Sequence, residues 1–334
     1  MFSGKDVLLL IGGKTDSKIM KTIEAFPNGF KGLSDLPEPL FNCTAALVNG
    51  HILVVGRKNS EGTNSEFCYK IKCSRANSQH VWKKVDKLLP KPMLGVHCMG
   101  SAVVKKDGHE RMYIVKGKNV YFTKNGEEWQ EVKDLPYGIS LPYLASDGDN
   151  VFVSGPRVQT DFSYDAYVLS KDGNCWNPLP KLLLNTDTGV SGSGVVNIGG
   201  KKVWLLVQGS QALKLELPYR TGDKQEWIKM KRPDLKNGPS VGMCGGKITV
   251  AGGRNGGKST KDVQTFNISE GIWENSNKPL RIPRWCHATV QIPSLTLSQK
   301  IKYFFKSIPG EFRCKSKTNE LEQDPESQSF ISQP

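Results

Sequence analysis

The residues that most suggest chemistry are the glycines, basic residues and hydroxyl between Gly252 and Ser259. The stretch GGRNGGKS fits the phosphate-binding pattern GxxxxGK[ST] and follows a β-branched run, as a phosphate loop should. A phosphate loop must lead into a helix, whose N-terminal amides hold the phosphates. Residues 261–268, KDVQTFNI, are instead rich in strand formers and lack a helical apolar stripe. We therefore predict a glycine-rich turn between two strands, and no nucleotide or other cofactor.

Cysteine and histidine positions do not predict a metal centre. Cys68 and Cys73 have no second pair at zinc-ribbon spacing. The adjacent histidine and cysteine pairs at 97–98 and 286–287 are expected on strands, where neighbouring side chains point to opposite faces. No Ser-His-Asp or paired-carboxylate pattern can be read from the sequence. We therefore predict no catalytic, cofactor-binding or metal-binding residues.

These residues belong to a repeat that runs along most of the chain. Six short apolar runs end at or near glycine, most clearly where Gly252 and Gly253 follow Ile248-Thr249-Val250. An aromatic residue opens the outer strand of each unit, at intervals of about 46–52 residues. These aromatic residues are Phe30, Trp82, Trp129, Trp176, Trp227 and Trp273. The pattern predicts four-stranded units, with glycine where backbones approach closely and the aromatic ring packed between neighbouring units.

The paired glycines, the spaced tryptophans and the period resemble the kelch repeat more closely than the WD repeat. The resemblance covers residues 1–293 and implies an all-β, six-bladed kelch-type β-propeller. Its blades are predicted at roughly 1–40 with 284–293, 41–92, 93–139, 140–187, 188–237 and 238–283. The chain begins with a second strand near residues 6–11 and has a spare first strand near 287–292. Pairing of these two strands is predicted to complete blade one and to remove an exposed edge.

Residues 294–334 form a tail of different character. A short amphipathic helix is predicted at 296–308, because apolar residues recur there on one helical face. Lysines lie off that face, so the helix could make a weak contact with an anionic membrane. The polar remainder is predicted to be disordered.

Charge and composition limit the class of partner that the protein is expected to bind. The net charge is +14, and the basic residues are scattered through the loops rather than gathered in one run. Such a surface favours acidic partners, and an acidic protein rather than nucleic acid is the predicted one. The N-terminus makes a poor signal peptide, and the eight cysteines are interpreted as buried thiols of a reducing compartment. A cytoplasmic monomer is predicted.

The kelch resemblance also implies where a ligand binds, namely at the loops between second and third strands and at the connectors between blades. The residues that map there are Arg57, Lys58, His97, Tyr143, Arg157, Arg254, Lys258, Lys261, Arg284 and Trp285. Guanidinium groups beside aromatic rings suit acidic peptides, because the guanidinium fork matches a carboxylate.

Two hypotheses about function follow from this resemblance. The first is a non-catalytic interaction module of the actin-associated or ubiquitin-ligase adaptor type. The alternative is a small-molecule enzyme at the axial funnel, such as a sugar-acid isomerase or a metal-dependent lyase. A carboxylate–histidine pair in the funnel would favour that alternative.

Overall fold

A computed structural model describes residues 6–27, 33–56, 67–73, 80–91, 99–158, 164–182, 192–208, 211–219, 225–234 and 238–293. The chain divides into two compact units, Met1–Ser294 and Leu295–Pro334. The helix predicted at 296–308 lies outside the described residues, as do Arg57, Lys58 and His97. In the described ranges, no helix has the length and apolar character needed to cross a membrane.

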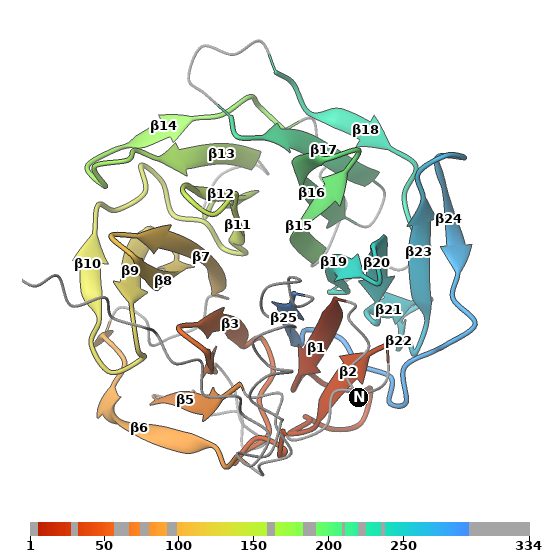
Figure 1. Ribbon diagram of the computed structural model, residues 1–334, viewed down its shortest axis with the longest axis horizontal. Coiled ribbons are helices and arrows are strands. Elements are labelled where there is room, and N and C mark those ends of the chain that lie inside the picture. Colours follow the sequence, from red (N-terminus) through yellow and green to blue (C-terminus); the bar gives the residue numbers. More distant parts are fainter. Residues whose placement is uncertain are drawn as a thin grey trace, which may run out of the picture. The chain divides into compact units, whose positions relative to one another are not determined.

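Six sheets of the first unit surround a central axis, as Figure 1 shows. Blade one has the order β2-β1-β25, with β1 (Val7–Ile11), β2 (Ile23–Phe26) and β25 (Ala288–Ile292). Blade two contains β3 (Thr44–Val48), β4 (His51–Val55), β5 (Phe67–Lys72) and β6 (Lys83–Leu88). Blade three contains β7 (Gly100–Lys106), β8 (His109–Lys116), β9 (Asn119–Thr123) and β10 (Gln130–Val132).

The remaining three blades repeat this antiparallel order. Blade four contains β11 (Tyr143–Ser146), β12 (Val151–Pro156), β13 (Tyr164–Leu169) and β14 (Trp176–Pro178). Blade five contains β15 (Gly192–Ile198), β16 (Lys201–Gln208), β17 (Gln211–Leu217) and β18 (Ile228–Met230). Blade six contains β19 (Ser240–Cys244), β20 (Lys247–Ala251), β23 (Val263–Asn267) and β24 (Ile272–Asn275). Between β20 and β23, the chain forms a small hairpin of β21 (Arg254–Asn255) and β22 (Lys258–Ser259).

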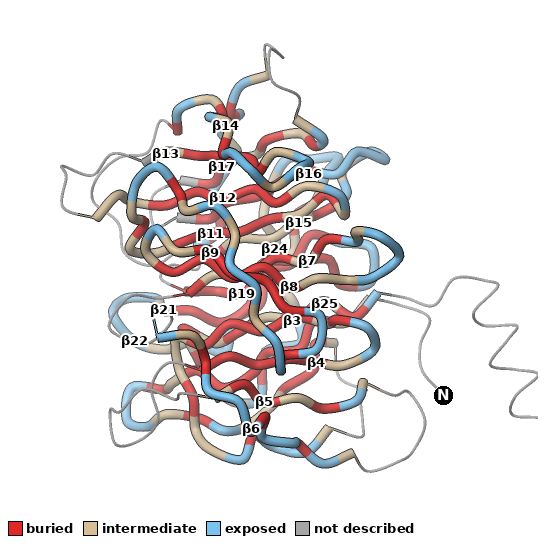
Figure 2. The backbone as a smooth tube through the Cα atoms, turned by 90° about the vertical axis from the view of Figure 1, so that its left-hand side faces the viewer, coloured by how far each residue is buried: buried red, intermediate tan, exposed pale blue. Residues whose placement is uncertain are grey.

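The hydrophobic core lies between the blades and is supplied mainly by the second strands. The LLLI run of β1 is fully buried, and β4 and β20 each bury four of five residues. The outermost strands, such as β6 and β18, are mostly exposed. Figure 2 shows buried backbone through the sheets and exposed backbone at the turns on either side. A sheet packed on both faces needs the continuous apolar runs that the sequence repeats.

The predicted exchange of strands between the two ends of the propeller is confirmed. β25 pairs antiparallel with β1, and the register joins Val7 to Ile292 and Ile11 to Ala288. Figure 1 shows β25 beside β1 near the axis. The all-β, six-bladed propeller is therefore closed by a strand from the far end of the same unit, which removes one sheet edge.

The tryptophans lie between blades, as their spacing predicts. Trp82, Trp176 and Trp227 are buried. Each donates its indole N–H to a backbone carbonyl of the preceding blade's segment, at 2.8 Å to Ser34, 2.8 Å to Lys133 and 3.1 Å to Pro180 respectively. Trp273 makes the same type of bond to Lys231 at 2.7 Å. In these four blades the ring therefore combines an apolar contact with a directional bond to the neighbouring blade, whereas the indole N–H of Trp129 has no hydrogen-bond partner among the described residues.

The glycine pair at 252–253 is needed for a close backbone approach. Both residues have positive φ, 68° and 93°. A Cβ on Gly252 would lie 2.7 Å from the carbonyl oxygen of Arg284. The chain then forms the β21–β22 hairpin rather than a helix. This confirms that the stretch is a turn of the blade, not a phosphate loop.

Candidate functional site on the loop face

We define the loop face as the side of the propeller formed by the loops between second and third strands and by the connectors between blades. Alternation of strand direction places all of these segments on the same side of the ring. Blade six contributes the β21–β22 hairpin, and residues 281–287 connect it to blade one. Blade one contributes residues 12–22. These three segments meet at the seam where the ring closes.

Two cations and two aromatic rings gather at this seam. The amino group of Lys14 lies 4.9 Å from the centre of the Trp285 ring and 5.3 Å from that of Phe41. The guanidinium carbon of Arg254 lies 4.8 Å from the centre of the Trp285 ring. All four side chains are partly exposed. We call Lys14, Phe41, Arg254 and Trp285 the aromatic–basic cluster. Its cations lie on ring faces rather than against carboxylates, and Arg254 also donates to the backbone oxygen of Gly257.

Backbone hydrogen bonds hold the cluster in place. Lys14 and Trp285 exchange two N–H···O bonds of 3.0 Å each. The backbone N–H of Ser259 donates to the Asp16 carboxylate at 3.0 Å, which ties the hairpin of blade six to the loop of blade one. Because strands and hairpins fix these backbones, the cluster is already arranged before any ligand arrives.

Two predicted residues extend the positive charge beside the cluster. Lys258 lies on the hairpin and Lys261 follows it, and both are exposed. In the part of the chain that the structure describes, neither lysine pairs with a carboxylate, and the same holds for Lys14 and Arg254. Four basic side chains therefore lie partly or fully exposed in one region without an ion pair, and the Asp16 carboxylate at the hairpin accepts the Ser259 N–H instead.

Arg284 does not belong to this surface, which corrects the prediction that it faces a partner. Its side chain is fully buried. It donates to the backbone oxygens of Leu10, Gly12 and Thr22 and, at 3.2 Å, to the Glu24 carboxylate. Burial lowers the pKa of Arg284, and the Glu24 charge opposes that shift. The residue joins blades six and one.

Arg157 lies on the loop face of blade four but is already engaged. Its Nε donates to the Asp165 carboxylate, and its guanidinium stacks 3.7 Å from the centre of the Tyr137 ring. The bond to Asp165 raises the pKa of Arg157. Arg157 is therefore less available to an acidic ligand than Arg254.

Two members of the aromatic–basic cluster are absent from the sequence prediction. Lys14 follows Gly12 and Gly13 as Arg254 follows Gly252 and Gly253, and Phe41 stands in its connector where Trp285 stands in the last one. Aligning the first and last repeats residue by residue would have identified both.

A separate cavity of about 130 Å³ lies at the axis of the ring. Its lining comes from five blade connectors and includes Tyr143, Cys286 and His287. The prediction that Cys286 and His287 point to opposite faces of a strand is wrong, because β25 begins only at Ala288 and Cys286 has a positive φ of 49°. The turn in the backbone allows both residues to line the cavity.

His287 joins blades six and one by hydrogen bonding, and its environment does not suit a general base. Its Nε2 lies 2.6 Å from the Ser240 hydroxyl, which lies 2.6 Å from the Thr289 hydroxyl. Desolvation, with a contribution from the Arg284 cation, lowers the pKa of His287 to about 3. A histidine that binds protons so weakly is a poor general base at neutral pH, and Ser240 is itself buried. Among the described residues, no group of three metal-ligating side chains comes together.

Four of the six described thiols are buried, as predicted, whereas Cys73 is partly exposed and Cys175 is exposed. Burial raises the pKa of Cys43 to about 11 and of Cys68 and Cys244 to about 12. Cys175 is exposed on a turn of blade four, so the prediction that all cysteines are buried is wrong there. Cys98 and Cys314 lie outside the described residues.

Comparisons with known proteins agree with this architecture. Residues 236–279, which contain the four main strands of blade six, match the kelch motif. No curated protein matches the chain. Among solved structures, the chain is similar to that of YjhT, with 15% identity, a TM-score of 0.56, and coverage of 78% of this chain and 90% of that one. At such identity the likeness concerns the fold alone. The chain carries a kelch motif and folds as a six-bladed β-propeller.

Proposed function

We propose that the protein is a non-catalytic interaction module that binds an acidic protein segment on its loop face. The observation that carries this proposal is the aromatic–basic cluster, in which Lys14 and Arg254 stack on Trp285 and no carboxylate neutralises them in the described residues. Lys258 and Lys261 add two exposed charges nearby. The net charge of +14 would speed the approach of such a segment.

The chemistry of the cluster suits a run of glutamates or aspartates. Each cation can donate hydrogen bonds to a carboxylate while its other side remains on an aromatic ring. The rings offer apolar area to the methylene groups of the ligand. Because the cations are partly exposed, binding should weaken strongly with salt.

An octaglutamate peptide carrying fluorescein tests the proposal by fluorescence anisotropy. The double variant Lys14→Gln with Arg254→Gln should bind it about tenfold more weakly, a loss of about 1.4 kcal/mol. The matched control is Lys105→Gln with Lys247→Gln, which removes two exposed charges from the opposite side of the ring. An equal loss in both variants would show that net charge alone attracts the peptide, and the loop-face assignment would be wrong.

The enzyme alternative has less support. It predicts a carboxylate beside a histidine in the funnel, whereas Nε2 of His287 meets the hydroxyl of Ser240. The lining residues of the axial cavity in the described part of the chain include no carboxylate. We therefore retain the interaction module as the proposed function, with the adaptor type still a prediction.

A further inference from the structure

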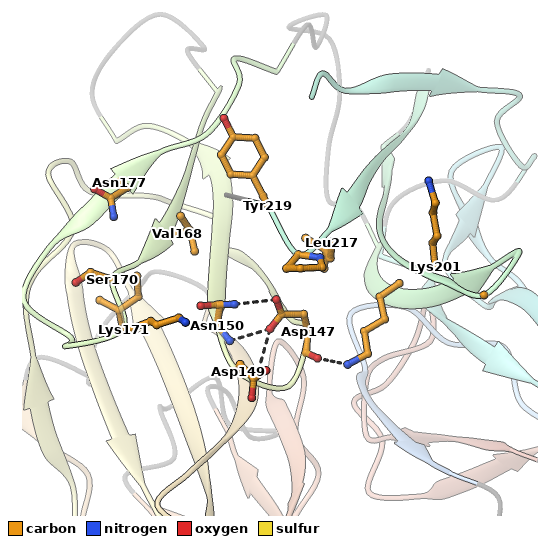
Figure 3. A pocket seen from close by; sticks show the side chains of 14 residues that line it. Asp147, Asp149, Asn150, Val168, Ser170, Lys171, Asn177, Lys201, Leu217 and Tyr219 are labelled. Atoms are coloured by element: carbon orange, nitrogen blue, oxygen red, sulfur yellow. Dashed lines mark hydrogen bonds between the residues drawn. The ribbon is translucent and has the colours of Figure 1, made fainter. Parts of the chain in front are cut away.

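A polar groove lies between blades four and five, on the side of the ring opposite the loop face. This side, which we call the turn face, carries the turns between first and second strands and between third and fourth strands. The groove has a volume of about 820 Å³, within the range of small-molecule sites. Figure 3 shows Ser170, Lys171 and Asn177 on one wall, Leu217 and Lys201 on the other, and Asp147 and Asn150 between them.

Three lysines and two aspartates supply the charge of the groove, so basic side chains outnumber acidic ones by one. Lys171, Lys201 and Lys202 line it. Lys201 pairs with Glu216 at 2.8 Å, whereas Lys202 donates to the backbone oxygen of Asp147 and, among the residues that the structure describes, to no carboxylate. Within the described ranges, the amino group of Lys171 has no partner. Two of the three ammonium groups therefore have no carboxylate partner in the described ranges, and both retain free N–H donors.

The carboxylate at the base of the groove does not cancel this charge by pairing with a lysine. Asp147 accepts the backbone N–H groups of Asp149 and Asn150, at 2.9 and 2.8 Å, and the Asn150 side-chain amide at 2.8 Å. With these hydrogen bonds the Asp147 carboxylate stabilises the turn at residues 147–150. Asp149 lines the groove as well and can accept a hydroxyl group from a ligand.

Part of the wall from blade five is apolar, beside the lysines of the same blade. Leu217, Pro218 and Tyr219 follow one another there. Tyr219 packs on the hydrophobic core between the two blades and is only partly exposed, so its ring is held in position. Figure 3 shows the Tyr219 ring above Leu217 at the edge of the groove. Such a wall offers a flat surface to a ring-shaped ligand.

We infer that this groove binds the phosphate monoester of a ring-bearing small molecule. The phosphate lies between Lys171 and Lys202, because an ammonium group with free donors is a common phosphate ligand. The ring lies against Pro218 and Tyr219. The groove is too large for inorganic phosphate alone, so both contacts contribute to affinity. The inference concerns a different face from the acidic-segment site and does not depend on it.

Isothermal titration with phenyl phosphate, inorganic phosphate and phenol tests each contact. Phenyl phosphate should bind about tenfold more tightly than inorganic phosphate, and phenol should not bind measurably. Lys171→Gln should weaken both phosphates by a similar factor, since it removes a charge and no bond to the protein. Tyr219→Ala should weaken phenyl phosphate and leave inorganic phosphate unchanged.

The variant Lys14→Gln with Arg254→Gln serves as the control on the other face, and it should bind phenyl phosphate as the natural chain does. Lys171→Gln with Lys202→Gln should abolish binding, with thermal unfolding measured in parallel. Unchanged affinity in Lys171→Gln, or equal affinity for phenyl phosphate and phenol, would overturn the inference. Loss of binding in the loop-face variant would overturn it too.

Discussion

The seam between blades six and one differs from the seam between blades four and five in what fills it. At the closing seam, buried Arg284 joins the Glu24 carboxylate and three backbone oxygens of blade one. His287, Ser240 and Thr289 add a second polar contact across the same seam. The apolar cluster there is small, with Leu8, Leu10 and Phe26 among its members.

The seam between blades four and five is filled by aromatic rings. Trp204 is fully buried, and its ring centre lies 6.2 Å from that of Phe152 and 5.2 Å from that of Trp227. Its indole N–H donates to the Ser193 hydroxyl at 2.9 Å, which in turn donates to the carbonyl oxygen of Leu144 in blade four. At the turn face the two blades separate around the groove.

The two seams differ in their contacts because they join segments at very different separations along the chain. Neighbouring blades inside the chain are joined by a short connector, so apolar packing suffices to bring them together. The closing seam joins segments more than 250 residues apart, and there a directional polar contact selects the correct partner strand. The next seam supports this view, because Leu40 occupies the connector position of Arg284 and packs on Gly56 of the following blade.

Among the tests of this comparison, Glu24→Gln should change the free energy of unfolding most. The variant leaves the Arg284 charge buried without a counter-ion, so we expect a loss of about 3–5 kcal/mol in the free energy of unfolding. Urea denaturation followed by tryptophan fluorescence measures it. The double variant Glu24→Gln with Arg284→Leu should recover most of that loss, since it removes the buried charge, keeps an acceptor for the backbone N–H groups of Arg281 and Ile282, and places a leucine where Leu40 stands in the next connector. If Glu24→Gln unfolds like the natural chain, the ion pair does not secure the seam.

Much of the fold could be predicted from local sequence, because its determinants are local. Paired glycines mark tight turns, and tryptophans at a regular interval mark the gaps between blades. The spare strand at 287–292 predicted closure, and β25 fulfils it with five paired residues. These signals depend on backbone geometry and burial, which a repeat expresses several times over.

The candidate sites could be predicted only in part, because they depend on side-chain direction and on the angle between blades. Arg254 and Arg284 both flank the closing seam. Arg254 stacks on Trp285 and is partly exposed, whereas the side chain of Arg284 is fully buried. Nothing in the residue type distinguishes them. The groove containing Lys171 and Lys202 joins segments from two blades, and no motif in the sequence links those segments.

The next test concerns pH and the closing seam. The pKa of His287 is about 3 in the folded protein, against about 6.5 in an unfolded chain. The unfolded state therefore binds the extra proton first as pH falls, and stability that is complete above about pH 6.5 declines toward pH 3. Between pH 7 and pH 5 this group should cost about 2 kcal/mol.

His287→Gln isolates that contribution, because glutamine does not titrate and can still meet the Ser240 hydroxyl. Its free energy of unfolding should fall by about 2 kcal/mol less than that of the natural chain between pH 7 and pH 5. Parallel pH profiles for the two proteins would mean that other groups govern the response to acid.

The smallest expected change in the free energy of unfolding is at the seam between blades four and five. There Lys202→Gln removes the hydrogen bond to the Asp147 carbonyl across the groove. Lys202 is exposed, and the aromatic cluster around Trp204 holds the two blades together independently. We expect the free energy of unfolding to change by no more than about 0.5 kcal/mol. Urea denaturation beside Glu24→Gln makes the comparison direct, because each substitution removes a single charge from one seam. A loss of several kcal/mol in Lys202→Gln would show that the lysine holds the blades in register, and the contrast between a polar closing seam and an apolar internal seam would fail.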